Sequence, residues 1–484
     1  MTDTSTAKPK LGARYSKLWT ASVISNLGDG VGAIAYPWLA SAVTRNALLI
    51  ALIAVAQRLP WLIFTLPAGV ITDRVDRRKI MIGMDVVRAL LTLFVAVAVL
   101  AGEGTLPAPE LLASGDVEIA TNANVYLVLL LSALLLGFAE VLRDNAAQTI
   151  LPSIVSAEQL ERANGNLWGA EMVANSFVGP PIGSALLAMG FAVPFFVDAG
   201  SFSVAAGLVF LIPGMFRASG GAKTGKVDWR GEISEGFRWL WKHPVLRPMA
   251  ISLGILNGLG MMAFATFVLF AQENLDLDTG LLTGVLGGFA DRLNFETVGT
   301  LVFALLMMGG AIGGVLGSVF GPRVSRRIGQ GPSLIVTIAA GAVTSLVIGL
   351  AGRWWVVFVM TVIAVFTAVL WNIITVSFRQ TIIPDQMLGR VNSVYRFFGW
   401  GMMPIGSAVG GVLVAVSESF VSRSLALRIP WIVTAIGYVA LLAYAGPRLT
   451  TDTLDAARAS GATTKAELDA TNRPASAGPG PSDD

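Results

Sequence analysis

The chain has 484 residues, of which 54% are hydrophobic and only 13% are charged, and its formal net charge at pH 7 is +3. Soluble proteins carry about 25% charged residues, so this composition excludes an ordinary soluble protein. The absence of cysteine and the single histidine, His243, exclude disulfide bonds and a metal cluster of histidine and cysteine. We therefore expect an integral membrane protein that uses no metal or other cofactor.

The chain begins with a polar, basic segment, residues 1–17, that lacks the apolar core of a removable signal peptide. Continuous apolar stretches follow, each near the ~20 residues needed to cross a bilayer, whereas the strands of a membrane β-barrel alternate in short segments. We predict about twelve membrane-spanning helices, at 18–43, 46–71, 79–101, 123–146, 160–188, 193–212, 246–271, 298–321, 331–352, 354–378, 391–417 and 428–447.

Two polar stretches lie outside the predicted spans. The central connection, 213–245, interleaves aromatic and basic residues, which predicts an amphipathic helix with its aromatic side in lipid and its basic side towards anionic headgroups. It is either a plain tether or a regulatory element. From Thr450 onward the chain is mainly Ala, Thr, Asp, Pro and Gly, so we expect the segment 448–484 to be disordered. The predicted domains are two helical bundles, 18–212 and 246–447.

The short polar connections differ in charge on the two sides of the membrane. Positive residues mark the cytoplasmic side of membrane proteins. They concentrate in the N-terminal segment, in the connections after the second and eighth spans, and in the central connection, whereas the loop 102–122 has no Lys or Arg and the loop 272–297 is mostly acidic. We therefore expect a multi-pass protein of the cell membrane with both termini in the cytoplasm.

Short sequence elements of the first half recur in the second. Gln148–Pro152 (QTILP) returns as Gln380–Pro384 (QTIIP), and Pro181–Ala185 (PIGSA) returns as Pro404–Ala408. With six spans in each half, both copies run in the same direction through the membrane. The sequence thus predicts an all-α integral membrane fold of two six-helix bundles, related as parallel repeats around a central cavity. Such a duplication points to a transporter with its path between the bundles.

The connection after the second span carries the sequence Gly69–Lys79 (GVITDRVDRRK). It resembles the loop signature of the major facilitator superfamily, with Asp76 in place of the usual second glycine. The resemblance implies an ionic latch that stabilises the outward-facing state. The predicted latch residues are Gly69, Asp73, Arg74, Arg77 and Arg78, with the arginines bridging to acids on other helices. The alternative is a loop kept basic for topology alone.

The fifth span contains Gly179, Pro180, Pro181 and Gly183. This stretch resembles a Gly-Pro element of the antiporter branches of the superfamily. Proline bends a helix and glycine permits close packing, so we predict a helix bend here and at Pro404 and Gly406 in the second half. A simple proline kink is the alternative.

Three further stretches, Asn26–Asp29, Glu140–Asn145 and Glu158–Asn166, resemble the drug and siderophore exporters of the same superfamily, which include macrolide-efflux and enterobactin-export proteins. An export direction follows only from these resemblances and from the Gly-Pro element.

Ionisable residues inside membrane spans are costly and are therefore functional candidates. Asp29 and Arg58 each lie about 12 residues, or ~18 Å, from the start of their span, so they can pair near the midplane and couple transport to protons. A structural salt bridge is the alternative. Glu171 is a second proton-site candidate or a hydrogen-bond acceptor in the cavity.

Other charged residues in the first half have different predicted roles. Glu140, Arg143 and Asp144 share one helix face near the cytoplasmic end of the fourth span, which favours a gate network with the Asp73 loop. Asp85 and Arg88 form a similar pair on the third span. Asp198 lies nearer the outer end of its span, at the interface.

The spans of the second half are nearly free of acids and offer amide and aromatic side chains instead. A cavity with ionisable groups on one wall and aromatic groups on the other suits a lipophilic, cationic or amphiphilic substrate. The predicted cavity residues are Asn26 in the first half and Asn257, Phe264, Trp371, Asn372, Tyr395 and Trp400 in the second.

No ATP-binding Gly-x-x-x-x-Gly-Lys-Ser/Thr motif occurs, and His243 lies in a loop, which leaves no Ser/His/Asp set within the membrane. We therefore predict a secondary transporter rather than an enzyme. It exports a lipophilic drug, antibiotic or siderophore-like molecule in exchange for protons. The alternatives are proton-coupled import of a metabolite and a non-transporting receptor or membrane enzyme. The expected partners are a small-molecule substrate, protons and the bilayer, without nucleic acid, and the protein is expected to be a monomer.

Overall fold

The computed structural model describes residues 11–102, 104, 106–107, 111–112, 119–156, 159–216, 229–276, 298–383 and 385–460. Within these ranges the chain is helical, with one isolated β-bridge between Asp276 and Arg353. Nine of the described helices are long and apolar enough to cross a membrane. The predicted all-α integral membrane fold is confirmed.

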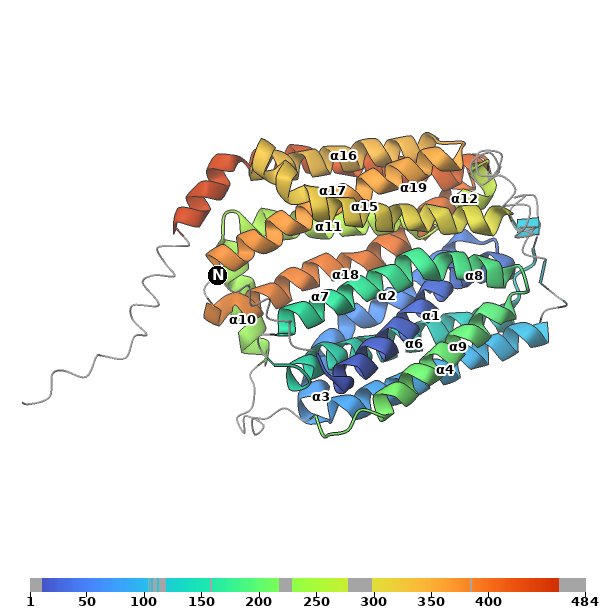
Figure 1. The fold of residues 1–484 in the computed structure, drawn as a ribbon. Coiled ribbons are helices and arrows are strands. Elements are labelled where there is room, and N and C mark those ends of the chain that lie inside the picture. Colours follow the sequence, from blue (N-terminus) through green and yellow to red (C-terminus); the bar gives the residue numbers. More distant parts are fainter. Residues whose placement is uncertain are drawn as a thin grey trace, which may run out of the picture.

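The helices of each half gather side by side, with the first half below the second in Figure 1. The first half comprises α1 (Ala13–Val43), α2 (Ala47–Ile63), α3 (Thr65–Arg74), α4 (Arg77–Gly102), α6 (Ala123–Ile150), the short 3-10 helix η2 (Leu151–Ser153), α7 (Leu160–Glu171), the π-helix η4 (Met172–Val178), α8 (Gly179–Leu187) and α9 (Ala192–Phe210). After α10 (Trp229–Lys242), the second half comprises α11 (Leu246–Phe264), α12 (Phe267–Asn274), α15 (Val298–Ile328), α16 (Gln330–Leu350), α17 (Trp354–Ile382), α18 (Asp385–Ser417) and α19 (Arg423–Ala445).

Two of the predicted spans are interrupted where proline removes backbone hydrogen bonds. The second span divides at Phe64, between Pro60 in α2 and Pro67 in the first turn of α3, where a missing N–H is tolerated. The fifth span passes through the π-helix η4 immediately before Gly179, Pro180 and Pro181, which open α8. Single-turn π-helices are rare and often lie at functional sites. In contrast, α18 continues through Pro404 without a break.

The repeated sequence elements occupy equivalent places in the two halves. Gln148 lies in the last turn of α6 and Gln380 in the last turn of α17, and the two Pro-Ile-Gly-Ser-Ala copies lie in α8 and α18. Each copy also makes the same kind of contact. A Cβ on Gly183 would lie 2.8 Å from the carbonyl oxygen of Val31 in α1, and a Cβ on Gly406 would meet the backbone of Gly258 in α11. Both glycines thus allow two helix backbones to touch.

The apolar packing differs between the two ends of the protein. At the end away from the N-terminus and α10, on the right in Figure 1, one buried cluster joins both halves, with the ring centroids of Trp38 and Phe303 5.6 Å apart. At the other end, one cluster lies entirely in the first half and another entirely in the second. The halves are therefore packed together at the end away from the termini.

The central helix α10 is an amphipathic helix that packs on protein. Glu235 pairs with Arg390 of α18 at 2.5 Å, Gly236 lies against the Arg390 backbone, and Phe237 stacks on Phe398 with centroids 6.3 Å apart. Leu240 is fully buried in the cluster of the second half. Phe237 therefore has an aromatic partner on α18, but it is still 42% exposed and Trp241 is 40% exposed, so contact of the aromatic side with lipid stays a prediction.

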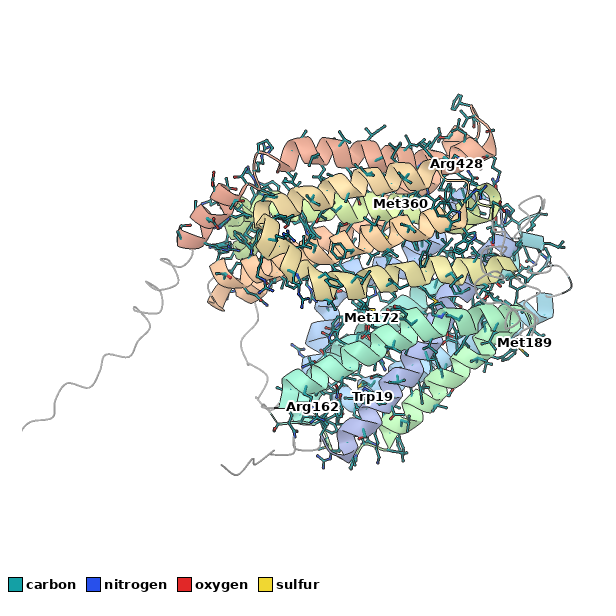
Figure 2. All side chains as sticks on the ribbon, turned by 45° about the horizontal axis from the view of Figure 1, so that its top comes forward. Trp19, Arg162, Met172, Met189, Met360 and Arg428 are labelled. Atoms are coloured by element: carbon teal, nitrogen blue, oxygen red, sulfur yellow. The ribbon has the colours of Figure 1, made fainter. Side chains whose placement is uncertain are left out.

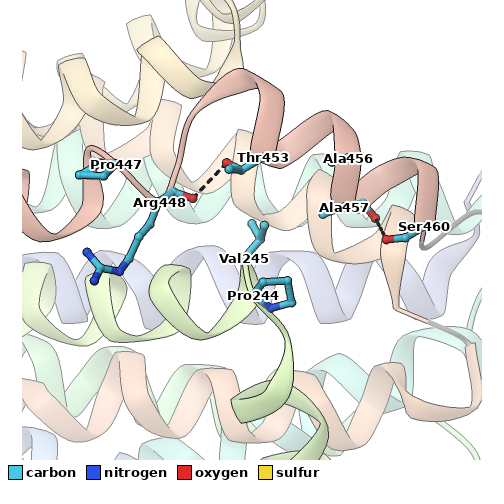
Figure 3. Close-up of a pocket in the computed structure, with 8 residues that line it drawn as sticks. All are labelled: Pro244, Val245, Pro447, Arg448, Thr453, Ala456, Ala457 and Ser460. Carbon is cyan, nitrogen blue, oxygen red and sulfur yellow. Dashed lines mark hydrogen bonds between the residues drawn. The ribbon is translucent and has the colours of Figure 1, made fainter.

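The predicted disorder of the C-terminal segment is wrong for its first part. Residues 451–460 form a helix that buries Leu454 and Ala457, three residues apart, against the second half. Arg458 donates to the side chain of Gln330 and lies over the ring of Phe378 at 5.5 Å. Between this helix and the start of α11 lies a cavity of about 440 Å³ (Figure 3), lined by Pro244, Val245, Pro447, Arg448, Thr453, Ala456, Ala457 and Ser460. Residues 461–484 lie outside the described part of the chain.

Candidate transport site

A chain of ion pairs crosses the interior of the first half. Arg88 of α4 pairs with Asp29 of α1 and lies 3.6 Å from Asp85. Arg143 of α6 lies 3.4 Å from the same Asp85 and 3.7 Å from Asp144. The order Asp29, Arg88, Asp85, Arg143, Asp144 therefore links three helices through alternating charges. We refer to these five residues as the charge chain.

The two ends of the charge chain are accessible and its middle is not. The side chains of Asp29 and Asp144 are 32% and 36% exposed, whereas those of Arg88, Arg143 and Asp85 are 4%, 6% and 0% exposed. The carboxylates at the ends can thus exchange a proton or bind a cation. The arginines remain behind them as fixed counter-charges.

Arg88 is held by more than its acids. One guanidinium nitrogen donates to the hydroxyl of Ser25 at 3.2 Å, and the guanidinium carbon lies 3.8 Å from the ring centroid of Phe202 in α9. A desolvated cation–π contact contributes about 2 kcal/mol. Arg88 is therefore fixed in position, whereas the side chain of its partner Asp29 is partly exposed.

Asp85, at the centre, is paired only loosely. Neither of its carboxylate oxygens accepts a hydrogen bond from the described residues, although both arginines lie within ionic range. A buried carboxylate without hydrogen bonds is costly. The two nearby guanidinium groups offset part of this cost through their charge.

The predicted partner of Asp29 was wrong. Arg88, not Arg58, pairs with Asp29. Arg58 is an exposed residue of α2, and α2 packs mainly against α6 and α18, whereas α1 packs against α9 and α8. The predicted depths of Asp29 and Arg58 say nothing about which helices are neighbours. The expected Asp85–Arg88 pair is confirmed.

Asp198 of α9 was expected at the membrane interface, and this expectation is wrong. Its side chain is buried and lies against Gly28 of α1, where a Cβ would collide with it. The hydroxyl of Ser201 lies 3.4 Å from one carboxylate oxygen. Asp198 therefore adds a carboxyl group to the interior of the first half.

The expected gate network of Glu140, Arg143 and Asp144 with the Asp73 loop stays a prediction. Within the described residues, Arg143 pairs with Asp85 of α4 and with Asp144. The side chains of Gly69 and Asp73 lie outside the described residues, and Arg74 is exposed.

The remaining latch arginines bind helix ends rather than acids. Arg77 donates to the carbonyl of Thr149 at 2.8 Å, and Arg78 donates to the carbonyls of Val209 and Phe210. The last carbonyls of a helix lack intrahelical partners and attract cations. Among the described residues neither Arg77 nor Arg78 pairs with an acid, and their bridges to acids on other helices stay a prediction.

Asp76, which replaces the usual glycine, has a clear structural role. Its carboxylate accepts hydrogen bonds from the backbone N–H groups of Arg78 and Lys79, at 3.0 and 3.4 Å, and from that of Phe216 at 3.2 Å. It therefore caps α4 and ties the chain after α9 to it. Asp is one of the preferred N-cap residues, and the sequence contained this signal.

Glu171 ends α7 and opens onto a small cavity of about 160 Å³ lined by Trp168, Glu171, Met172, Asn175 and Ser176. Met172 lies between the two halves in Figure 2. The cavity thus combines a carboxylate, an indole, a thioether and two small polar groups.

Only some of the predicted cavity residues of the second half are exposed. Trp371 and Tyr395 are buried in the cluster of that half, with Arg379 3.7 Å from the Tyr395 ring centroid, and this placement corrects the prediction for both. Asn257 donates to the carbonyl of Gly399 at 2.9 Å and joins α11 to α18.

Of the other predicted cavity residues, Trp400 lies where the two halves meet. Trp400 stacks on Trp61 of the first half with centroids 5.0 Å apart. Phe264 is exposed, Asn372 is exposed and bonds to Ala368, and Asn26 is half-buried and bonds to Ser22.

Comparisons with known proteins support the fold and its class. The model of the Major Facilitator Superfamily matches residues 18–407. The multidrug efflux pump Tap of Mycolicibacterium fortuitum is 28% identical over 425 residues, which cover 86% of this chain and 92% of that protein. The pump of the same name from Mycobacterium tuberculosis (strain ATCC 25618 / H37Rv) is 25% identical over 428 residues, 86% of this chain and 90% of its own length.

Two solved structures share the fold at low sequence identity. A mutant of the nucleoside transporter NupG superposes with a TM-score of 0.67 at 11% identity, over 90% of this chain and all (100%) of that one. A bacterial homologue of the human lysosomal transporter Spinster superposes with a TM-score of 0.63 at 15% identity, over 93% and 99% of the two chains. The family match spans most of the helices described above. The chain is therefore a multi-pass membrane transporter that belongs to the Major Facilitator Superfamily.

Proposed function

We propose that the protein exports a lipophilic, positively charged small molecule in exchange for protons, by alternating access between its two halves. The observation that carries this proposal is the charge chain, with accessible carboxylates at its ends and buried arginines between them. A carboxylate that holds a proton cannot also pair with a cationic substrate. Binding of one therefore favours release of the other, which is the requirement for exchange.

The charge balance of the first half supports a cation. Beyond the first turn of each span, the predicted spans of the first half carry six acids, Asp29, Asp85, Glu140, Asp144, Glu171 and Asp198, against three arginines, Arg58, Arg88 and Arg143. An excess of acids inside a membrane protein favours protonation or cation binding, because unpaired charges there are costly. An anionic substrate would add to this excess.

Two observations support the proposed direction of transport. The curated relatives named above are multidrug efflux pumps. With both termini in the cytoplasm, as the distribution of Lys and Arg predicts, the packed end faces the exterior and substrate enters from the cytoplasm. Exit would then follow when the packed end opens.

The proposal is tested in proteoliposomes with an imposed pH gradient. We expect tetraphenylphosphonium, a lipophilic monocation, to move against its own gradient when protons flow the other way, and a protonophore to abolish this movement. Protein-free liposomes give the background. Movement of the probe together with protons would instead support import, and movement that ignores the pH gradient would contradict proton coupling.

Glu171 is expected to recognise the charge of the substrate. Replacing it with Gln keeps the shape of the small cavity and removes its charge, so we expect the Kd for tetraphenylphosphonium to rise about tenfold, or ~1.4 kcal/mol. Binding of triphenylphosphine oxide, a neutral compound of similar shape, should not change. Equal losses for both compounds would show that Glu171 contributes packing and not charge recognition.

A further inference from the structure

An ion network joins the two halves at the packed end, away from the transport site. Arg45 lies in the connection between α1 and α2 of the first half. Its guanidinium donates to the side-chain oxygen of Gln272 and to one carboxylate oxygen of Glu273, both at 2.6 Å. Gln272 and Glu273 are in α12 of the second half. The contact therefore bridges the halves.

The Glu273 carboxylate also pairs with a second arginine, which belongs to the same half of the protein. Arg423, the first residue of α19, donates to both oxygens of Glu273, at 2.7 and 3.0 Å. It also donates to Glu418 at 2.6 Å and to the backbone carbonyl of Arg45 at 2.7 Å. The side chains of Arg45 and Glu273 are each only 10% exposed.

Two further hydrogen bonds join the halves at this end. Gln272 donates to the hydroxyl of Ser41 in α1 at 2.9 Å, and Ser184 of α8 donates to Thr300 of α15 at 2.9 Å. Beneath them lies the apolar cluster shared by both halves. Separation of the halves at this end must therefore break the Arg45–Glu273 pair.

We propose that Glu273 is a carboxylate shared by two arginines, and that this sharing makes closure of the packed end reversible. Its pair with Arg45 of the other half breaks when this end opens, whereas its pair with Arg423 of the same half persists. This inference goes beyond the proposed substrate and rests only on alternating access. A half-buried carboxylate that loses its only cation is strongly disfavoured. Because Arg423 belongs to the same half as Glu273, the carboxylate keeps a bidentate partner after the halves separate. Opening therefore leaves only Arg45 without its ion-pair partner, and water can then solvate its guanidinium group.

This arrangement predicts opposite effects for two members of one network. Glu273→Gln removes the bond between the halves and leaves two guanidinium groups side by side, so the closed state is weakened. Arg423→Gln leaves Glu273 with Arg45 when closed and, among the described residues, with no cation when open, so the closed state is favoured. The bond from Arg423 to the Arg45 carbonyl is also lost. Water replaces that single bond on opening, so its loss is the smaller effect.

The test uses the absence of cysteine in the chain. Spin labels on Asn124→Cys and Phe420→Cys report the distance between the halves at the packed end, and labels on Ser153→Cys and Ile328→Cys report the other end. Distances are measured by electron paramagnetic resonance on the full-length protein in lipid nanodiscs. All four positions are exposed.

We expect Glu273→Gln to raise the ratio of open to closed molecules at the packed end about tenfold, and Arg423→Gln to lower it by a similar factor, within the usual range of coupling between sites. Glu418→Gln is the matched control. It removes an acid that contacts Arg423 but belongs to the same half, so the ratio should stay unchanged.

Two outcomes overturn the inference. Shifts of Glu273→Gln and Arg423→Gln in the same direction, or a shift in neither, would show that Glu273 is not shared in this way. If tetraphenylphosphonium and pH change neither distance in the wild-type protein, alternating access itself fails, and the proposed function fails with it. Wild-type alternation combined with unshifted variants would overturn only the role of Glu273.

Discussion

Asp29→Asn is expected to reduce proton-driven transport on the order of a hundredfold, since a hydrogen bond to a charged group contributes about 1.5–3 kcal/mol. The amide has nearly the shape of the carboxylate but cannot take up a proton at working pH. Arg88 would remain paired with Asp85, so the protein should still fold. The measurement is uptake of tetraphenylphosphonium into proteoliposomes under an imposed pH gradient. Thermal unfolding and gel filtration report whether the variant is folded.

The partner of Asp29 can be tested with a matched pair of variants. Arg88→Gln removes the buried cation that holds Asp29, whereas Arg58→Gln removes an exposed one. We expect the first to lose proton coupling and the second to retain it. Full coupling in Asp29→Asn, or loss in Arg58→Gln alone, would contradict the assignment of the charge chain as the proton site.

Gly183→Val is expected to disrupt the contact between α8 and α1. A Cβ at this position would lie 2.8 Å from the carbonyl oxygen and 3.1 Å from the Cα of Val31. Backbone atoms cannot move aside as a side chain can, and overpacking of this kind usually costs about 1–3 kcal/mol and occasionally more. We expect a lower unfolding temperature and loss of most transport, because α1 carries Asp29.

Gly200→Val provides the control for this effect. Gly200 lies within α9, and a Cβ there would have nothing within 4 Å. This variant changes the same residue type in a helix of the same bundle, so its unfolding temperature and transport should stay near those of the wild-type protein. Equal losses in both variants would show that valine in a helix, and not the contact with α1, causes the effect.

Much of the fold could be predicted because the bilayer imposes simple requirements. A span must be apolar over its whole length, so continuous runs such as 79–101 and 354–378 lie within α4 and α17. The repeated elements also predicted the parallel halves, since both copies kept the glycine that their helix contact needs. The wrong prediction of disorder at 451–460 has a different cause. A segment of low hydrophobicity needs only two buried residues, Leu454 and Ala457, to dock on a surface that already exists.

The predicted site was less accurate, for geometric reasons. Position along a helix follows from counting residues, so the sequence by itself placed Asp29 and Arg58 within predicted spans. Rotation of each helix and the choice of its neighbours depend on packing between helices distant in the chain. Only the tertiary structure therefore decided that Arg88 holds Asp29, that Asp198 is buried, and that Tyr395 belongs to a core. It alone joined Arg45 to Glu273, because that pair exists only where the two halves meet.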